Sequence, residues 1–527
     1  MLSKVLSVRS SVIALAIAMA VSGRAELAHA ETLADAITAA YQSNPNIQAQ
    51  RAAMRALDEN YTQARAAYGL QASASVSENY TRQKLARLPN DTANEGAAQT
   101  NQLSVSQALY TNGRYAARLG GIEAQIKSSR ESLRRLEMDL LVRVTSAYVS
   151  VHRDREVLRI SSGAESWLAK QLQDTQDKYS VRLVTLTDVE QAKARLAAAS
   201  TQVANAQAQL NVSVANYASL VGHVPEQLEP EPDIDGLPAT LDEAFDTAEK
   251  NNPSLMAALY TEESSRLGVA EARAQRLFSV TARADYSNSP YNSLNVGPSL
   301  RTDTLTAGIT LTQPLFSSGQ LNSSVRQSLE ENNRDKLLIE DARRNMVLSV
   351  SQYWDNLVAA RRTLVTIEAE MKADTVAFYG VREEERFALR STIEVLNAQA
   401  ELLNAQLNFV RSRAIEYTGR VQLLAQLGTL EVGDLAPGVQ SYDPKRNFRK
   451  VRYKGMLPTE LIIQTLDHVS LPMAAKKPKA GDTTPIRPPA SDLPAPPVSA
   501  DKVKPPESIN DLKSLSDDAP VATAPKG

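Results

Sequence analysis

The sequence predicts an α+β membrane protein: long α-helices form a coiled-coil barrel, and each chain gives four strands to a β-barrel. Three observations support this fold class. The chain repeats itself at a nearly constant offset, each half has two stretches of alternating apolar and polar residues, and each half has long helical patterns. An internal structural repeat therefore organises the whole fold.

The first segment, residues 1–30, is predicted to be a secretory signal peptide. Lys4 and Arg9 give it a basic start, Val12–Val21 is apolar, and Ala28-His29-Ala30 is a small-x-small cleavage site. The alternative is an N-terminal membrane anchor, but this apolar stretch is about half of the roughly 20 residues that a spanning helix needs. We therefore expect an exported chain without a transmembrane helix.

Composition argues against several classes of function. The 58 Lys and Arg balance 60 Asp and Glu, so no basic surface suggests nucleic acid as a partner. Cysteine is absent and the four His are far apart in the sequence, so neither a thiolate nor a His-based metal site is expected. The sequence also lacks a phosphate-binding loop and a nucleophile–base pair. We expect no cofactor and no enzymatic activity.

An internal duplication is the most informative feature of the sequence. Thr32–Ala36 returns as Thr240–Ala244, and Asn44-Pro45 returns as Asn252-Pro253, both at an offset of 208 residues. Further on the offset becomes 206, where QALYTNG at residues 107–113 matches QPLFSSG at residues 313–319. Chance does not give a constant register across separated blocks. The predicted domains are a first repeat at 31–224, a linker rich in Pro, Glu and Asp at 225–238, and a second repeat at 239–436.

Each repeat contains one predicted β-hairpin, at about residues 70–110 and 277–316. Apolar and polar residues alternate there with the period of a strand. Strands half-buried in a soluble core show the same alternation. The export signal, a strand length near 10 residues and aromatic residues at the strand ends favour membrane-spanning strands instead. These aromatic residues are Tyr80, Tyr110, Tyr286 and Phe316.

Four strands cannot form a membrane barrel alone. A sheet in lipid must close, because an open edge leaves backbone groups without hydrogen bonds in hydrocarbon. Small closed barrels need about eight strands. The chain is therefore expected to share its barrel with copies of itself, and three copies would give 12 strands.

Long helical patterns follow each hairpin, at about residues 114–178 and 320–385. A shorter helical region precedes each hairpin and is interrupted at Asn44-Pro45 and at Asn252-Pro253. A further helix of about 35 residues follows each long one, and from Val189 it carries a heptad seam. A run of about 65 helical residues is roughly 97 Å long. Such helices fit a tube that extends from the membrane into the periplasm.

The last segment, residues 437–527, differs in composition from the repeats. It contains 15 of the 25 prolines together with Lys, Ala, Asp and Ser. Such a composition buries little apolar surface, so we expect a disordered, Pro-rich C-terminal tail.

Several local patterns resemble the TolC family of outer-membrane efflux proteins. QALYTNG and QPLFSSG resemble its strand-to-helix segment, and VRLVTLTDV at 181–189 and RSTIEVLNA at 390–398 resemble its two tip motifs. The resemblance covers about residues 32–435. It implies a homotrimer in the outer membrane whose barrel continues into a periplasmic tunnel. A periplasmic adaptor (membrane fusion) protein and an inner-membrane RND or ABC transporter would complete a tripartite export system for drugs, type I secreted proteins or both.

The resemblance also implies a periplasmic gate at the turns Tyr179–Thr187 and Phe387–Ile393. By the motif, Asp188 and Arg390 would form an ion pair that holds the gate shut. Where the family has two pore-lining Asp, this sequence has Glu394 and Asn397. One ring of three carboxylates would remain, so cation block would be weaker. The candidate adaptor contacts at the tips are Leu183, Thr187, Leu389 and Thr392.

Two further departures concern the tips. Arg182 replaces the glycine of the first tip, which puts a left-handed turn there in doubt. Glu385 stands where the family pattern has a hinge tyrosine.

Two other classes of function were weighed against the export duct. A surface adhesin made of a coiled-coil trimer would be expected to have one C-terminal membrane region, whereas these strands lie inside both repeats. An enzyme would need a convergent site, which carboxylates scattered along long helices do not supply. The export duct is therefore the leading prediction.

Overall fold

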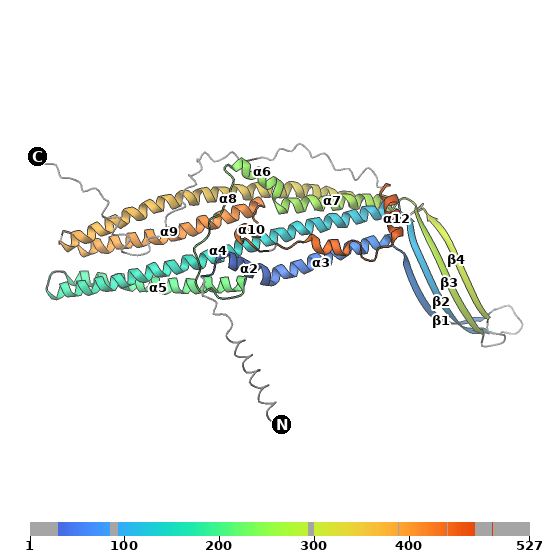
Figure 1. The fold of residues 1–527 in the computed structure, drawn as a ribbon, viewed down its shortest axis with the longest axis horizontal. Coiled ribbons are helices and arrows are strands. Elements are labelled where there is room, and N and C mark those ends of the chain that lie inside the picture. Colours follow the sequence, from blue (N-terminus) through green and yellow to red (C-terminus); the bar gives the residue numbers. More distant parts are fainter. Residues whose placement is uncertain are drawn as a thin grey trace, which may run out of the picture.

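The computed structural model describes residues 30–84, 93–293, 300–387, 389–439, 441–469 and Arg487. The protein is elongated, with long helices side by side at one end and a bent four-stranded sheet at the other (Figure 1). The predicted signal peptide lies outside the described residues except for Ala30.

The helices confirm the duplication. The first repeat contains α2 (Leu33–Ser43), α3 (Pro45–Arg65), η1 (Ala66–Tyr68), α4 (Arg114–Ser180) and α5 (Leu186–Val221). The second repeat contains α6 (Leu241–Asn251), α7 (Pro253–Ala274), α8 (Gln320–Arg386) and α9 (Thr392–Leu427) in the same order.

The two Asn-Pro pairs break the first helical region of each repeat. The Asn44 side chain accepts hydrogen bonds from the backbone N–H groups of Asn46, at 3.0 Å, and Ile47, at 3.4 Å. Asn252 caps α7 in the same way. Proline follows as the first helical residue, where its missing N–H costs nothing. Each Asn-Pro pair therefore ends one helix and begins the next.

The long helices α4 and α8 have 67 residues each. At 1.5 Å per residue each is about 100 Å long. Helix α5 folds back along α4, and α9 folds back along α8. The predicted seam of α5 faces inward: Val189, Ala192, Ala199, Ala206 and Tyr217 are all buried. Alanine along the seam lets the paired helices approach closely, as the heptad pattern predicted.

The four strands form one antiparallel sheet in the order β1-β2-β3-β4. They are β1 (Gln71–Lys84), β2 (Ala93–Tyr110), β3 (Ser279–Ser293) and β4 (Leu300–Thr312). Strands β2 and β3 join the two repeats, and in this sheet the outer edges of β1 and β4 have no pairing strand. The sheet is therefore open at both sides, as four strands require.

The strands are longer than the predicted length of about 10 residues. They have 13 to 18 residues, so Tyr80 and Tyr286 lie within strands rather than at strand ends. That part of the aromatic prediction was wrong, because the alternation continues further than the apolar residues alone indicate. Val76, Leu103, Leu305 and Ile309 are large, exposed and on the same face, as a lipid-facing surface requires. Among the described helices, none is long and apolar enough to cross a membrane.

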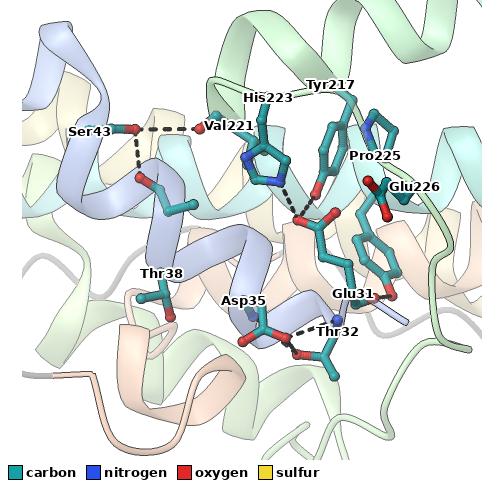
Figure 2. A network of polar contacts seen from close by, with 12 residues as sticks. Glu31, Thr32, Asp35, Thr38, Ser43, Tyr217, Val221, His223, Pro225 and Glu226 are labelled. Carbon is teal, nitrogen blue, oxygen red and sulfur yellow. Dashed lines mark hydrogen bonds and ion pairs between the residues drawn. The ribbon is translucent and has the colours of Figure 1, made fainter. Parts of the chain in front are cut away.

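Polar contacts anchor the start of the first repeat to the linker at the middle of the molecule. The Tyr217 hydroxyl donates to Glu31 Oε1 at 2.5 Å, and His223 Nε2 lies 2.9 Å from the same oxygen (Figure 2). The Glu31 backbone N–H donates to the carbonyl of Gln227 at 2.7 Å. The Tyr148 hydroxyl lies within hydrogen-bond distance of the Glu31 carbonyl. Glu31 thus connects the linker with α4 and α5, and the Tyr148 hydroxyl of α4 also lies 2.7 Å from the linker carbonyl of Glu229.

The C-terminal segment corrects the prediction of a disordered tail. After α10 (Val432–Leu435), residues 441–469 form α11 (Lys445–Val451) and α12 (Pro458–Val469). Arg65 of α3 donates to the carbonyls of Arg452, at 2.9 Å, and Lys454, at 2.6 Å. The segment folds because Phe448, Val451 and Ile463 recur on its inner side and are buried. The rest of the predicted tail lies outside the described residues, apart from Arg487.

Candidate functional site: the two helix tips

The turns between paired long helices lie at the same end of the molecule, opposite the sheet (Figure 1). One joins α4 to α5 and the other joins α8 to α9. Each of the sequence-predicted gate and contact residues lies in one of these turns or in the helical turns next to it.

The first tip ends α4 with a left-handed residue. Arg182 has φ 65°, its N–H donates to the Tyr179 carbonyl at 2.9 Å, and the Leu183 N–H donates to the Lys178 carbonyl at 2.9 Å. This pair of bonds is a Schellman motif, which glycine usually supplies. The left-handed turn that the missing glycine put in doubt is therefore present, and Arg182 adopts it.

The two tips present equivalent leucines. The Leu389 N–H donates to the Glu384 carbonyl, five residues earlier, at 2.9 Å. Leu183 makes the equivalent hydrogen bond in the first tip. Both leucine side chains are 74% exposed. Thr187 is also exposed, but Thr392 is buried at 6% exposure. Thr392 therefore does not face solvent in the protomer, which corrects its placement among the surface contacts.

Asp188 and Glu394 cap the helices that leave the tips. Asp188 Oδ2 accepts from the Thr185 N–H at 2.8 Å and from its hydroxyl at 2.7 Å. Glu394 Oε2 accepts from the Ser391 N–H at 2.8 Å and from its hydroxyl at 2.9 Å. Both are the acidic members of capping boxes, a role that the T-x-x-D and S-x-x-E spacing could have indicated from the sequence.

Arg390 is engaged within the second tip. Its Nε donates to Glu384 at 2.8 Å, and its Nη1 donates to Glu394 at 2.9 Å. The pKa of Glu394 falls to about 2, because the Ser391 N–H and the Arg390 guanidinium favour the carboxylate. Among the described residues no contact joins Asp188 to Arg390. Within one protomer both partners of that predicted ion pair are used elsewhere.

Other contacts do link the two repeats near the tips. Lys178 Nζ at the end of α4 lies 2.6 Å from Glu385 Oε1 at the end of α8. Arg195 of α5 donates to Asn397 Oδ1 of α9 at 3.0 Å. The Trp167 ring packs edge-on against Phe378, with ring centroids 5.5 Å apart. Sequence reasoning missed Lys178, Arg195 and Trp167, because these residues lie outside the tip motifs and their contacts depend on how the helices of the two repeats pack.

A family comparison decides what this architecture is. The model of the outer membrane efflux protein family matches residues 36–223 and 244–429, one range within each predicted repeat. The chain belongs to the outer membrane efflux protein family. It is therefore an outer-membrane efflux protein that extends into the periplasm, as the resemblance predicted.

Relatives and solved structures agree with this family. Outer membrane efflux protein BepC of Brucella suis is 26% identical, over 82% of this chain and 92% of BepC. TolC of Escherichia coli is 23% identical, over 80% of this chain and 86% of TolC. The CmeC outer membrane channel of Campylobacter jejuni has the same fold, with a TM-score of 0.66 at 15% identity, over 80% of this chain and 89% of CmeC.

The tips of this efflux protein carry exposed leucines, capped helix starts and ion pairs. In the described part of the chain, no three His, Cys, Asp or Glu are grouped to hold a metal ion. The family is one of channels, and none of the matches supports the adhesin alternative.

Proposed function

We propose that three copies of this efflux protein assemble into one continuous duct across the outer membrane and periplasm. Four strands from each copy would close a 12-strand barrel, and the long helices would form the tunnel wall below it. The observation that supports this proposal is the open sheet. Its β1 and β4 edges have no pairing strand in the described chain. Open edges are not tolerated in hydrocarbon, so another copy must pair with them.

Mass measurement and channel recording test this assembly together. The detergent-solubilised protein should have the mass of three mature chains, and planar bilayers should show a small, stable conductance. A monomeric mass with no conductance at any voltage would refute the duct.

The tips would form the closed periplasmic end of the duct. In the trimer the Lys178–Glu385 and Arg195–Asn397 contacts would hold the two repeats of each copy together. Asp188 and Arg390 would meet across neighbouring copies, because within one copy they bond elsewhere. One ring of Glu394 carboxylates would line the entrance, and their low pKa keeps them charged at neutral pH.

Exposed leucines at both tips suit a protein partner. Leu183 and Leu389 are equally exposed and sit at matching positions of the two turns, together with the exposed Thr187. A periplasmic adaptor that repeats its own contacts could bind both tips in the same way, and an inner-membrane RND or ABC transporter would supply the energy. The duct itself would be passive, so the transporter would choose between drugs and type I secreted proteins.

Site-directed cross-linking tests the adaptor contact. A photo-reactive residue at Leu183 or at Leu389 should cross-link the adaptor in cells, whereas one at the exposed Val212, far from the tips along α5, should not. Equal labelling at all three positions would contradict a tip-specific contact.

A further inference from the structure

Helix α12 holds the first strand-to-helix turn of the efflux protein. Its inner residue Asp467 is fully buried and accepts from the backbone N–H groups of Thr111, at 3.0 Å, and Gly113, at 2.9 Å. The Tyr68 hydroxyl donates to the same carboxylate at 3.0 Å. Helix α4 has no side-chain cap from its own Gly113, so the C-terminal segment supplies one.

The outer side of α12 is apolar and exposed. It presents Leu461, Ile462 and Val469, all with large exposed side chains. Its inner side is already occupied by β2, η1 and α4. Exposed apolar patches of this kind usually mark a contact site, so we expect apolar residues of another chain to cover this side of α12.

The matching turn of the second repeat is uncovered in the same chain. Leu315 and Phe316 are 92% and 88% exposed, whereas their counterparts in the first repeat are packed. Leu109 packs against the cluster that contains Ile463 of α12, and the Tyr110 ring lies 5.7 Å from that of Phe278. In the described chain the C-terminal segment thus covers the first of the two equivalent turns and leaves the second exposed.

The duplication shows where the neighbouring copy would place this turn. Tyr110 at the end of β2 pairs with Val280 at the start of β3. Their repeat equivalents are Phe316 and Ala72, so closure of the barrel would pair the continuation of β4 with the start of β1 in the next copy. By the same equivalence the contact of Tyr110 with Phe278 would become a contact of Phe316 with Leu70, which is half-exposed in the isolated chain.

Helix α12 begins beside that meeting point. A Cβ atom added to Gly69, the residue before Leu70, would lie 3.1 Å from Glu460 Oε1 of α12. Gln107 at the end of β2 donates to Thr459 of α12 at 3.4 Å. The arriving turn of the neighbour would therefore lie against the side of α12 that its own chain leaves exposed.

We propose that α12 of each copy binds Leu315 and Phe316 of the neighbouring copy, so that one C-terminal helix closes the first turn of its own chain and the second turn of the next. This proposal rests on the assembly of copies proposed above. It assigns the C-terminal segment a role as an inter-copy staple at the junction of barrel and tunnel.

Cysteine cross-linking tests the staple, because the chain has no cysteine of its own. Leu315→Cys is combined with Leu461→Cys or with Ile462→Cys, and membranes are treated with a short bismaleimide. At least one pair should convert the monomer band into linked dimers and trimers on a denaturing gel. The control pair Leu315→Cys with Leu183→Cys joins opposite ends of the molecule and should stay monomeric (Figure 1).

A second pair separates failure of the staple from failure of the assembly. Val76→Cys with Leu311→Cys tests the β1–β4 edge, since Ala284 and Val105, their repeat equivalents, pair directly. Linked bands from this pair without any from the α12 pairs would overturn the staple and leave the trimer. Absence of both would overturn both. Labelling of Leu315→Cys by a lipid-soluble maleimide in the assembled barrel would assign the turn to lipid and also overturn the staple.

Discussion

Arg182 occupies a left-handed backbone conformation that any residue with a Cβ atom adopts at a cost. A left-handed residue other than glycine costs roughly 1–2 kcal/mol, although glycine would lose more entropy on folding. The turn persists because the Arg182 and Leu183 N–H groups both bond back to α4. Hydrogen bonds back to α4 therefore hold Arg182 in this conformation against its own backbone preference.

Arg182→Gly should stabilise the first tip by roughly 0.5–1 kcal/mol, as the left-handed strain is relieved. The Leu183 amide, which bonds to Lys178, should then exchange with deuterium about two- to fivefold more slowly. Ser180→Gly in the last turn of α4 is the matched control and should speed the same exchange. Faster exchange in Arg182→Gly would contradict the strain.

The carboxylate of Glu394 should make the second tip sensitive to acid. Its pKa is lowered to about 2 by the Ser391 N–H and by Arg390, below the ordinary value of 4.5. A lowered pKa gives stabilisation that is complete above pH 4.5 and is lost as pH falls towards 2. Hydrogen exchange of the start of α9 should therefore be slower in wild type than in Glu394→Gln at pH 6, and equal near pH 2. An equal difference at both pH values would exclude this charge effect.

The roles of these residues were only partly predictable. The S-x-x-E spacing around Ser391 and Glu394 is a local signal, and it correctly locates the start of α9. Which of the carboxylates of Glu384, Glu394 and Asp188 pair with Arg390 depends on distances across a turn. Sequence spacing does not supply such distances.

At the level of elements, the helical period and the constant offset between the repeats gave the most accurate predictions. The expected long helices at 114–178 and 320–385 agree with α4 and α8 to within two residues, because Gly113 and Gly319 mark both starts. Helices α11 and α12 were missed, because the Pro-rich composition of residues 437–527 as a whole outweighed the local apolar residues of α12. Pro458 nevertheless stands at the first position of α12, where proline is favoured.

The hydrogen bond from the Gly113 N–H to Asp467 joins α12 to the start of α4. No local sequence pattern reveals it, because the two residues are 354 positions apart. Asp467→Ala should leave the Thr111, Gly113 and Tyr68 donors unpaired in a buried site and cost about 2–4 kcal/mol. Trypsin should then cut more rapidly after Lys454, as α12 detaches. Asp443→Ala removes an exposed acid that pairs with Arg449 and is the control. Unchanged cleavage in Asp467→Ala would show that α12 is held by its apolar residues alone.

At the scale of the whole molecule, the two ends have opposite requirements. In the proposed duct the sheet end would be closed permanently, because its edges would lie in lipid. The tip end of the proposed duct would have to open, so we expect the links between its repeats to be few and weak. Lys178–Glu385 is partly exposed, and pairs of this kind contribute about 0.2–1 kcal/mol each. Closure by copies is a prediction that rests on the number of strands, whereas the links between the repeats at the tips could be identified only from the fold.

Reversing one charge of the Lys178–Glu385 link should open the duct. Lys178→Glu places two carboxylates where the ion pair is now 2.6 Å long, so the closed state loses about 1 kcal/mol and the open-to-closed ratio rises about fivefold. Single-channel recording would measure this as longer dwell in the higher conductance. The double variant Lys178→Glu with Glu385→Lys should restore wild-type gating. Lys193→Glu, which disturbs only a local pair with Glu190 on α5, should leave it unchanged. Failure of the double variant to restore gating would mean that this ion pair does not hold the two repeats together at the closed end.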